Sequence, residues 1–501
     1  MSSLRWLVSF SLLAFVSSLG VKSQAEEKPA VEVTLADGVT QQAITGRLYV
    51  YLTQSNAGEP RNGPNWFNPE PFFRLDVKDF APGQQRVVDD SAAGFPDVLS
   101  KLPAGTYRVQ ALLDHNFDWA DPNQGTGNFY SKEARWQHNP QQPTKLVLTL
   151  DQVIGGKDFP KVDHLHEMVL NSELLSKFHQ REVEERATVV LPKAYFTDEK
   201  KRFPVVYVIP GFSGSHRQGL AYRQPTQAAA GEVDFIRVML SGQCKWGHHV
   251  YANSATHGPR GDALVQEMIP LIDRTFRTVA QPTARFVNGH SSGGWSSLWL
   301  QVTYPDTFGG VWSTSPDPVD FRDYQQVNLY ANPPLSLYVD EQGQRRPIAR
   351  RGRTPILWYD SFGKMDDVLG RGGQLRSFEA VFSPLDTDGL PRQLWDRRTG
   401  RIDPVTAKAW EAYDIHLKIK RNWPQLAPSL AGKLHIITGE LDTFYLEGAV
   451  RLLGQTLQQL GSDAVVEIVP GASHSSLLTP TLTSRLRHEM SQSYLKHHPP
   501  E

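Results

Sequence analysis

The chain has 501 residues, of which 40% are hydrophobic and 21% are charged, a composition typical of globular proteins. Its formal net charge of −1 argues against functions that require a strong electrostatic field, such as nonspecific binding to nucleic acid or anionic lipid. The single cysteine, Cys244, excludes an intramolecular disulfide, so stability must come from core burial. We expect Cys244 to be a small buried side chain rather than a nucleophile, because no base is evident beside it.

Residues 1–25 have the pattern of a secretory signal peptide. Arg5 precedes an apolar run from Trp6 to Leu19 that is too short for a comfortable bilayer span, and small residues follow near Ala25. The sequence therefore predicts a secreted or periplasmic protein after cleavage, with an uncleaved anchor as the alternative. No later segment approaches about 18 uninterrupted apolar residues, so no membrane span is expected in the mature chain.

Residues 28–155 predict an all-β domain. Short alternating runs separated by turn-rich loops are expected as strands over 31–35, 45–52, 105–113 and 144–150, and together they favour a β-sandwich of roughly immunoglobulin size. Its aromatic residues form either a ligand platform or simply core and loop plugs; they are Trp66, Phe67, Phe72, Phe73, Trp119 and Trp136.

Residues 156–185 are rich in charged side chains and are predicted to be a linker. His164 and His166 lie beside Asp163 and Glu167, which raises the alternative of a metal site. The spacing matches no specific ligand motif. The prediction is therefore a solvated connector without a metal.

From 186 to 497 the pattern alternates between strand and helix. Apolar runs typical of parallel strands buried on both faces lie at 188–191, 204–209, 235–240, 308–312, 434–438 and 465–469. Amphipathic helices are expected over 260–276, 448–460 and 483–495. This alternation predicts an α/β fold with a doubly wound, mostly parallel sheet. It is interrupted by a long irregular insertion at 313–430, typical of a cap or specificity element.

One glycine-rich motif in this domain carries the clearest chemical signal. The sequence Gly289-His-Ser-Ser-Gly293 directly follows the apolar strand that contains Phe286 and Val287. A G-x-S-x-G sequence between a strand and a helix is typical of the nucleophile elbow of serine hydrolases, where glycines flank a tight, strained turn. We therefore predict that Ser291 is a nucleophile whose hydroxyl stands above the edge of the sheet.

A nucleophilic serine needs a base, usually a histidine that a carboxylate holds in one tautomer. In hydrolases built around this elbow, the acid and then the histidine follow the serine along the chain. Asp442 and His474 each follow a predicted strand, at the carboxyl ends where functional residues of parallel sheets gather. The predicted catalytic set is Ser291, Asp442 and His474, with Glu440 and Asp317 as alternative acids.

The oxyanion formed by attack on a carbonyl requires two preorganised donors. The amide of Ser292, the residue after the nucleophile, is one candidate. The loop after the strand at 204–209 offers the other, because Pro210 has no N–H and Gly211 permits close approach, which leaves the amide of Phe212. This chemistry needs neither a metal nor an organic cofactor.

Residues 186–497 resemble the putative-esterase family of α/β-hydrolases, which includes esterase D, enterochelin esterase, and feruloyl and acetyl-xylan esterases. The matching segments are 203–211, 266–273, 289–294, 304–308, 439–442 and His474. The resemblance implies cleavage of carboxylic esters by Ser291, Asp442 and His474 through an acyl-enzyme. Several secreted bacterial members also carry an N-terminal β-sandwich.

Two departures from the family pattern leave the substrate open. The oxyanion loop has Pro210-Gly211 where members often have His-Gly, and the insertion is longer than in compact members. Tryptophans in this domain suit sugar or phenolic groups, so a carbohydrate-linked or siderophore ester is the working hypothesis for the substrate. No nucleic-acid partner is expected, and the oligomeric state is left open.

Two other functions stay open on the residues alone. The same scaffold can serve a serine peptidase or an acyltransferase. A secreted, non-catalytic binding protein with a decayed hydrolase domain is the second alternative, although the intact serine, acid and histidine argue against it.

Overall fold

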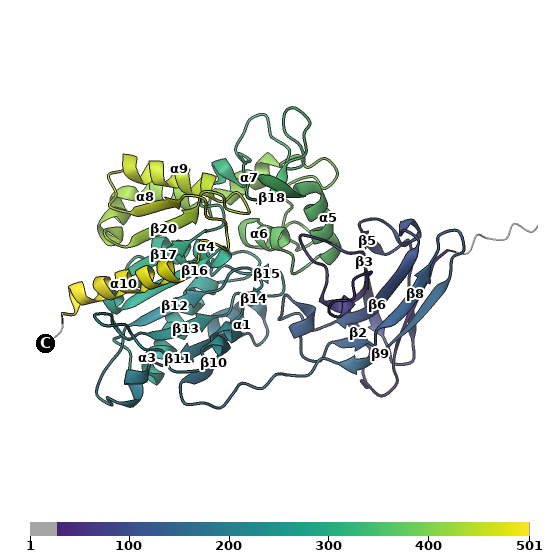
Figure 1. Ribbon diagram of the computed structural model, residues 1–501, viewed down its shortest axis with the longest axis horizontal. Helices are drawn as coiled ribbons and strands as arrows, with labels where there is room; N and C mark the ends of the chain where they lie inside the picture. The colour runs from purple at the N-terminus through teal and green to yellow at the C-terminus, as the bar shows by residue number, and fades with distance from the viewer. Residues whose placement is uncertain (1–27, 500–501) are drawn as a thin grey trace, which may run out of the picture.

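The computed structural model describes residues 28–499, so the predicted signal peptide lies outside the described residues. Two sheets organise these residues, and Figure 1 shows the N-terminal strands, in purple and blue, as a body beside the larger α/β part. No helix within 28–499 is both long enough and apolar enough to cross a membrane.

The N-terminal sheet has nine strands in the order β4-β1-β9-β7-β6-β2-β3-β5, with β8 paired to β6. This confirms the expectation of an all-β region. Its strands are β1 (Ala30–Leu35), β2 (Ile44–Thr53), β3 (Phe72–Phe80), β4 (Gln85–Val88), β5 (Ala93–Phe95), β6 (Gly105–Asp114), β7 (Phe129–Ser131), β8 (Ala134–His138) and β9 (Lys145–Val153). The single-turn helices η1 (Pro60–Asn62), η2 (Leu99–Lys101) and η3 (Pro122–Gln124) lie in its loops.

Strand β2 shows how this sheet is buried on both faces. Leu48 and Val50 pack into the domain's own core, whereas Tyr49 and Tyr51, which alternate with them, belong to the core of the α/β part. Side chains alternate across a strand, so one strand serves both cores. Phe73 and Trp136 lie in the N-terminal core. Of the two roles considered for them, ligand platform or core residue, they have the second.

The second sheet has eight strands in the order β10-β11-β13-β12-β16-β17-β20-β21. Neighbours from β13 onward are parallel, and β10 and β11 pair antiparallel at one edge. The bounds are β10 (Leu165–Asn171), β11 (Glu184–Val190), β12 (Val205–Ile209), β13 (Ile236–Leu240), β16 (Arg285–His290), β17 (Gly310–Thr314), β20 (Leu434–Gly439) and β21 (Val465–Val469). The mostly parallel, doubly wound sheet expected from the sequence is therefore present.

The segment expected as a connector is largely ordered within this sheet. Residues 165–171 form β10, which pairs with β11 along its length, and α1 (Glu173–His179) follows. Ser172 caps α1 by accepting a hydrogen bond from Leu175 N at 3.1 Å. An edge strand carries exposed charged residues on its free side, which explains why its sequence resembles a solvated linker.

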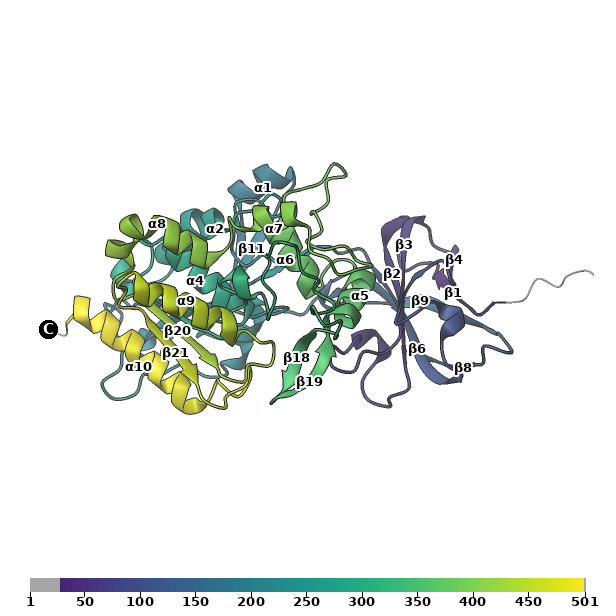
Figure 2. The same cartoon turned by 90° about the horizontal axis from the view of Figure 1, so that it is seen from above.

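Helices cover both faces of the sheet, as Figures 1 and 2 show. Alternate residues of β16 point to opposite faces, with Phe286 in the cluster formed with α10 (Pro480–His497) and Val287 in the main core. The main-core face carries α4 (Ser292–Thr303), α9 (Glu447–Gln459) and the run α2 (Arg260–Ala263), η6 (Leu264–Met268) and α3 (Ile269–Thr275).

The insertion between β17 and β20 is not irregular, contrary to the sequence-based expectation. It forms the hairpin β18 (Pro347–Arg351) and β19 (Thr354–Trp358) and the helices α5 (Tyr359–Leu369), α6 (Gln374–Phe382), α7 (Pro404–Trp410) and α8 (Ile415–Leu430). These elements are short and their apolar residues, such as Phe362, Phe378 and Trp410, join the main core. Tertiary packing rather than local periodicity therefore stabilises them.

The two parts are joined by buried polar contacts. Asp114 of β6 pairs with Arg371 just after α5, and both side chains are almost fully buried. Tyr49 Oη and Arg47 Nη1 donate to the carbonyl of Leu369 at 2.8 and 2.9 Å. Figure 2 shows α5 beside the N-terminal sheet. The N-terminal sheet is thus packed against the insertion.

Candidate active site

Ser291 lies at the turn between β16 and α4, as the sequence predicts. Its backbone has φ 61° and ψ −127°, a strained conformation for a residue with a side chain. Its N–H donates to the carbonyl of Thr314 at 3.0 Å, and its carbonyl accepts from Trp295 N at 3.0 Å. These bonds hold the turn in place against its strain.

The two glycines of the motif are required by close packing around this turn. A Cβ at Gly289 would lie 2.1 Å from the carbonyl oxygen of Gly293, and a Cβ at Gly293 would lie 2.0 Å from the carbonyl oxygen of Ile209. Neither position can accept a side chain without moving the backbone, so α4 approaches the sheet only because both residues are glycine.

The predicted base and acid are in direct contact. His474 follows β21, and its Nδ1 lies 2.8 Å from Oδ2 of Asp442, which follows β20. Asp442 is fully buried and His474 is 8% exposed. Because an ionised carboxylate only accepts hydrogen bonds, this geometry assigns the proton to Nδ1 and leaves the Nε2 lone pair free.

The two alternative acids lie elsewhere. Glu440 points away from the histidine and accepts a hydrogen bond from Gly471 N at 2.9 Å. Asp317 is buried beneath the serine turn, where its N–H donates to the carbonyl of Ser291 at 3.3 Å. Among the side-chain hydrogen bonds of 28–499, His474 pairs with Asp442 and with neither alternative.

His290 connects the serine turn with the histidine. Its ring centroid lies 4.5 Å from that of His474, and its Nδ1 lies 3.1 Å from Thr314 Oγ1. Burial, reinforced by the nearby His474, lowers the pKa of His290 to about 3. His290 is therefore neutral near pH 7 and provides a packing surface for His474.

The loop 210–214 lies directly beside Ser291. A Cβ at Gly211 would lie 3.4 Å from the Cβ of Ser291, an ordinary van der Waals distance, so the two residues are direct neighbours. The amides of Phe212 and Ser292 donate to no backbone or side-chain acceptor within residues 28–499. Both predicted donors are therefore unpaired within the described residues.

Two positioning residues escaped the sequence analysis. His248 holds the 210–214 loop, because its Nε2 lies 3.1 Å from the carbonyl of Pro210 while its Nδ1 accepts from Val250 N at 2.8 Å. Arg350 of β18 holds the loop that carries Asp442. It donates to the carbonyl of Asp442 at 2.9 Å and pairs with Glu447 at 2.6 Å. The adjacent histidines 248 and 249 are a feature of the sequence that could have indicated a positioning role. No local pattern marks Arg350 within the insertion.

The model of the family described as "Putative esterase" matches residues 180–464, more than half of the chain. The chain belongs to this family. It is a carboxylic ester hydrolase, in agreement with the resemblance found in the sequence.

Solved structures similar to this esterase are distant in sequence. A ferulic acid esterase is 14% identical with a TM-score of 0.37, covering 66% of this chain and 98% of its own. An S-formylglutathione hydrolase from Agrobacterium tumefaciens is 14% identical with a TM-score of 0.39, covering 65% and 95%. Dipeptidyl peptidase 4 from Porphyromonas gingivalis is 13% identical with a TM-score of 0.38, covering 84% and 46%. No curated protein matches the sequence of this esterase.

A narrow cavity of the esterase lies between the insertion and the loop after β20. Its walls are mostly apolar and include Phe444 after β20, with Ile348, Leu357, Phe362, Leu375 and Phe378 from the insertion. Asp317, Gln325 and Gln374 are its polar lining residues. The Oδ2 atom of Asp317 is buried without a hydrogen-bond partner in the described residues, which is costly for a charged group.

This burial predicts a pH-dependent effect of Asp317→Asn on stability. Burial raises the pKa of Asp317 from 3.8 to about 6, so the folded state holds its proton where the unfolded chain has lost it. Wild-type stability therefore falls relative to the variant as the pH rises from about 4 to about 6. At about 1.4 kcal/mol per pKa unit, the variant should be more stable by up to about 3 kcal/mol at pH 8.

Urea unfolding of both proteins at pH 4 and pH 8 checks this expectation. The difference in the free energy of unfolding should be small at pH 4 and should favour the variant at pH 8. An equal difference at the two pH values would show that the carboxyl does not titrate as inferred.

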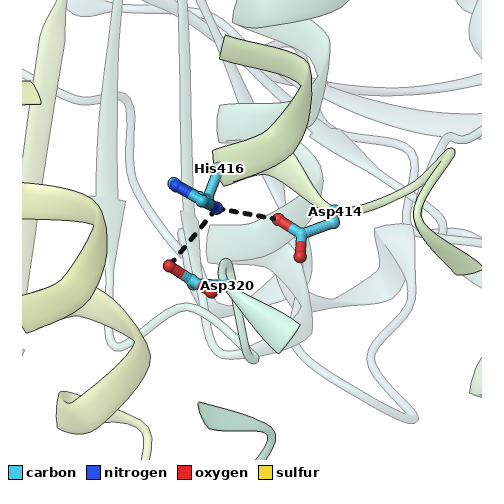
Figure 3. A group of neighbouring side chains, drawn as sticks. All are labelled: Asp320, Asp414 and His416. Atoms are coloured by element: carbon cyan, nitrogen blue, oxygen red, sulfur yellow. Dashed lines mark ion pairs between the residues drawn. The ribbon is translucent and has the colours of Figure 1, made fainter. Parts of the chain in front are cut away.

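A second polar cluster has the residue types of a metal site. Asp320, Asp414 and His416 lie together (Figure 3), with His416 Nδ1 3.5 Å from Asp320 and 3.9 Å from Asp414. Arg322 Nη2 donates to Asp320 at 2.6 Å, and Tyr330 Oη donates to Asp414 at 2.8 Å. Asp414 also accepts from two backbone amides, one at the start of α8. These donors occupy the carboxylates, so the cluster joins the start of the insertion to α8 and is a poor metal site.

The other sequence candidates for special chemistry have ordinary roles. His164 contacts the carbonyl of Tyr222 at 2.9 Å, and His166 contacts that of Asp163 at 3.0 Å, so each imidazole has its own backbone partner. Cys244 is buried, and burial raises the pKa of its thiol to about 11. A thiol in that state is a poor nucleophile at neutral pH.

Proposed function

We propose that the esterase hydrolyses its substrate through an acyl-enzyme, with Ser291 as nucleophile, His474 as base and Asp442 as the acid that orients it. The observation that supports this most directly is the 2.8 Å contact between His474 Nδ1 and the fully buried Asp442. It lies at the same sheet edge as the strained turn of Ser291, since His290 packs on His474.

In the proposed reaction, Ser291 Oγ attacks the ester carbonyl while His474 Nε2 takes its proton. The amides of Phe212 and Ser292 donate to the resulting oxyanion. The tetrahedral intermediate collapses, and His474 returns the proton to the departing alcohol. Water, activated by His474, then attacks the acyl-enzyme, so that the carboxylic acid leaves and the Ser291 hydroxyl is restored.

We further propose that the protein is secreted or periplasmic, and that its substrate is a small-molecule or polysaccharide-linked ester. The apolar run of residues 6–19 supports export. N-terminal sequencing of the protein recovered outside the cytoplasm should begin near residue 26. A mature chain that retains Met1 would contradict cleavage.

Labelling with a fluorophosphonate probe tests the proposed nucleophile. Such probes phosphonylate activated serines, so we expect one label per folded chain, on the peptide that contains Ser291, with hydrolysis of nitrophenyl esters lost in parallel. Heat-denatured protein is the control and should remain unlabelled, because activation requires His474 nearby.

Other outcomes of this experiment identify the alternatives. A folded protein that takes up no label would contradict the acyl-enzyme and favour a binding function. A labelled protein that cleaves peptide anilides faster than nitrophenyl esters would be a peptidase. One that transfers its acyl group to an added alcohol rather than to water would be an acyltransferase.

A further inference from the structure

A loop of the N-terminal domain packs against residues that adjoin the proposed catalytic residues. Residues 63–71 connect η1 to β3 and carry Trp66 and Phe67 at their centre. Asn65 Oδ1 accepts hydrogen bonds from Phe67 N at 2.9 Å and Asn68 N at 3.3 Å, which forms an Asx turn. The two aromatic side chains are therefore presented by an ordered turn.

Trp66 packs against Phe212, the residue whose amide is proposed to bind the oxyanion beside Ser291. Its ring centroid lies 5.5 Å from that of Phe212 and 5.2 Å from that of Phe362 in α5. Phe212 follows Gly211, which lies next to the Cβ of Ser291. Trp66 thus contacts the side chain of the residue whose amide is proposed to bind the oxyanion.

Phe67 lies on the opposite side, near the histidine. Its ring centroid is 6.2 Å from that of Phe444, and Phe444 meets the ring of His474 edge-on at 5.0 Å. Phe444 N also donates to Asp442 Oδ1 at 2.9 Å. Phe67 remains 45% exposed, so part of its side chain is accessible to a ligand.

The loop is held in this position by the contacts between the two parts of the chain. Arg74 of β3 donates to the carbonyl of Asp367 at 3.0 Å, near the end of the helix that carries Phe362. Tyr49 and the buried pair of Asp114 with Arg371 join the same region. Rigid placement lowers the entropic cost of using a loop side chain for binding.

We propose that the N-terminal domain completes the substrate-binding site through an aromatic ledge, defined as Trp66 and Phe67, and that Phe67 binds an aromatic ring in the alcohol part of the ester. The inference rests on the proposed function, because the alcohol must leave with a proton from His474. The alcohol part therefore lies on the His474 side of the serine, where Phe444 and Phe67 stand. Trp66 acts as a positioning residue for Phe212.

Acetate esters of two alcohols test this assignment in the full chain. Benzyl acetate and ethyl acetate form the same acetyl-enzyme and differ in the aromatic ring of the alcohol. Phe67→Ala should lower kcat/KM for benzyl acetate about 10-fold, the effect of losing one aromatic contact and its buried area. The value for ethyl acetate should change less than about twofold, and Phe67→Trp should retain the wild-type preference.

The rate of deacylation distinguishes a contact between Phe67 and the alcohol from other roles of Phe67. It should be unchanged in Phe67→Ala, because the alcohol has already left the acetyl-enzyme. Phe196→Ala is the matched control, since Phe196 is 46% exposed and lies at the end of η4 (Lys193–Phe196). It should leave both esters unaffected.

Three results would contradict the proposed role of the aromatic ledge. An equal loss on both esters would make Phe67 merely structural, and an unchanged kcat/KM for benzyl acetate would remove it from the substrate site. A changed deacylation rate would place the acyl part there instead. Failure of the proposed function is recognised separately, because Ser291 would then take up no fluorophosphonate in the wild type.

Discussion

Replacement of Ser291 by alanine should reduce kcat for ester hydrolysis by about 10⁴-fold or more, because the covalent route is lost while substrate binding and the oxyanion donors remain. KM should change little, since the hydroxyl contributes mainly to the transition state. Steady-state kinetics on nitrophenyl acetate measure both constants, and circular dichroism confirms that the variant is folded.

Ser213→Ala is the matched control for this loss. Ser213 is an exposed serine with a positive φ of 62° in the neighbouring loop, outside the strand-to-helix turn that carries Ser291. Activity near the wild-type level is expected. Retention of the wild-type rate by Ser291→Ala would refute the assigned nucleophile, and a comparable loss in Ser213→Ala would point to general disturbance of the site.

Asp442→Asn should lower kcat by about 10³–10⁴-fold, nearly as much as loss of the serine. The asparagine is almost isosteric, so the buried site keeps its shape. However, an amide NH₂ facing His474 Nδ1 favours the tautomer in which Nε2 carries the proton, and that nitrogen then has no lone pair for the Ser291 proton. The protonated imidazole also loses its negative partner.

Glu440→Gln is the control, because Glu440 lies two residues earlier and bonds to Gly471 N rather than to the histidine. Its activity should stay within a few-fold of the wild type. The double variant Ser291→Ala with Asp442→Asn should be no slower than Ser291→Ala alone, because the acid acts through the serine. A further multiplicative loss would mean that Asp442 has a separate role in the reaction.

The nucleophile turn could be predicted because its signal is local. Gly289 and Gly293 lie within a few residues of Ser291 and must be glycine because a Cβ would meet the backbone of neighbouring residues. A tight strand-to-helix turn of this kind is therefore recognisable from the glycines alone. Asp442 and His474 could be placed because they follow strands, and the carboxyl ends of parallel strands share one edge of a sheet.

The elements that were missed depend on contacts between distant segments. The insertion was expected to be irregular because it contains several stretches rich in proline and glycine, yet Phe362 and Trp410 are buried in the common core. The residues 165–171 were expected in a linker because an edge strand keeps one side polar. Arg350 lies 92 positions from Asp442 in the chain, and no spacing rule links the two.

The sequence by itself determined the fold class and the strand-to-helix turn at Ser291, and it supplied the proposed order of acid and histidine, because periodicity and glycine requirements act over short stretches of chain. Only the tertiary structure decided which carboxylate pairs with His474 and how Trp66 and Phe67 of the N-terminal domain come to pack against Phe212 and Phe444. Contacts between residues that lie more than a hundred positions apart in the chain depend on how the two sheets pack, and this packing produces no local sequence pattern.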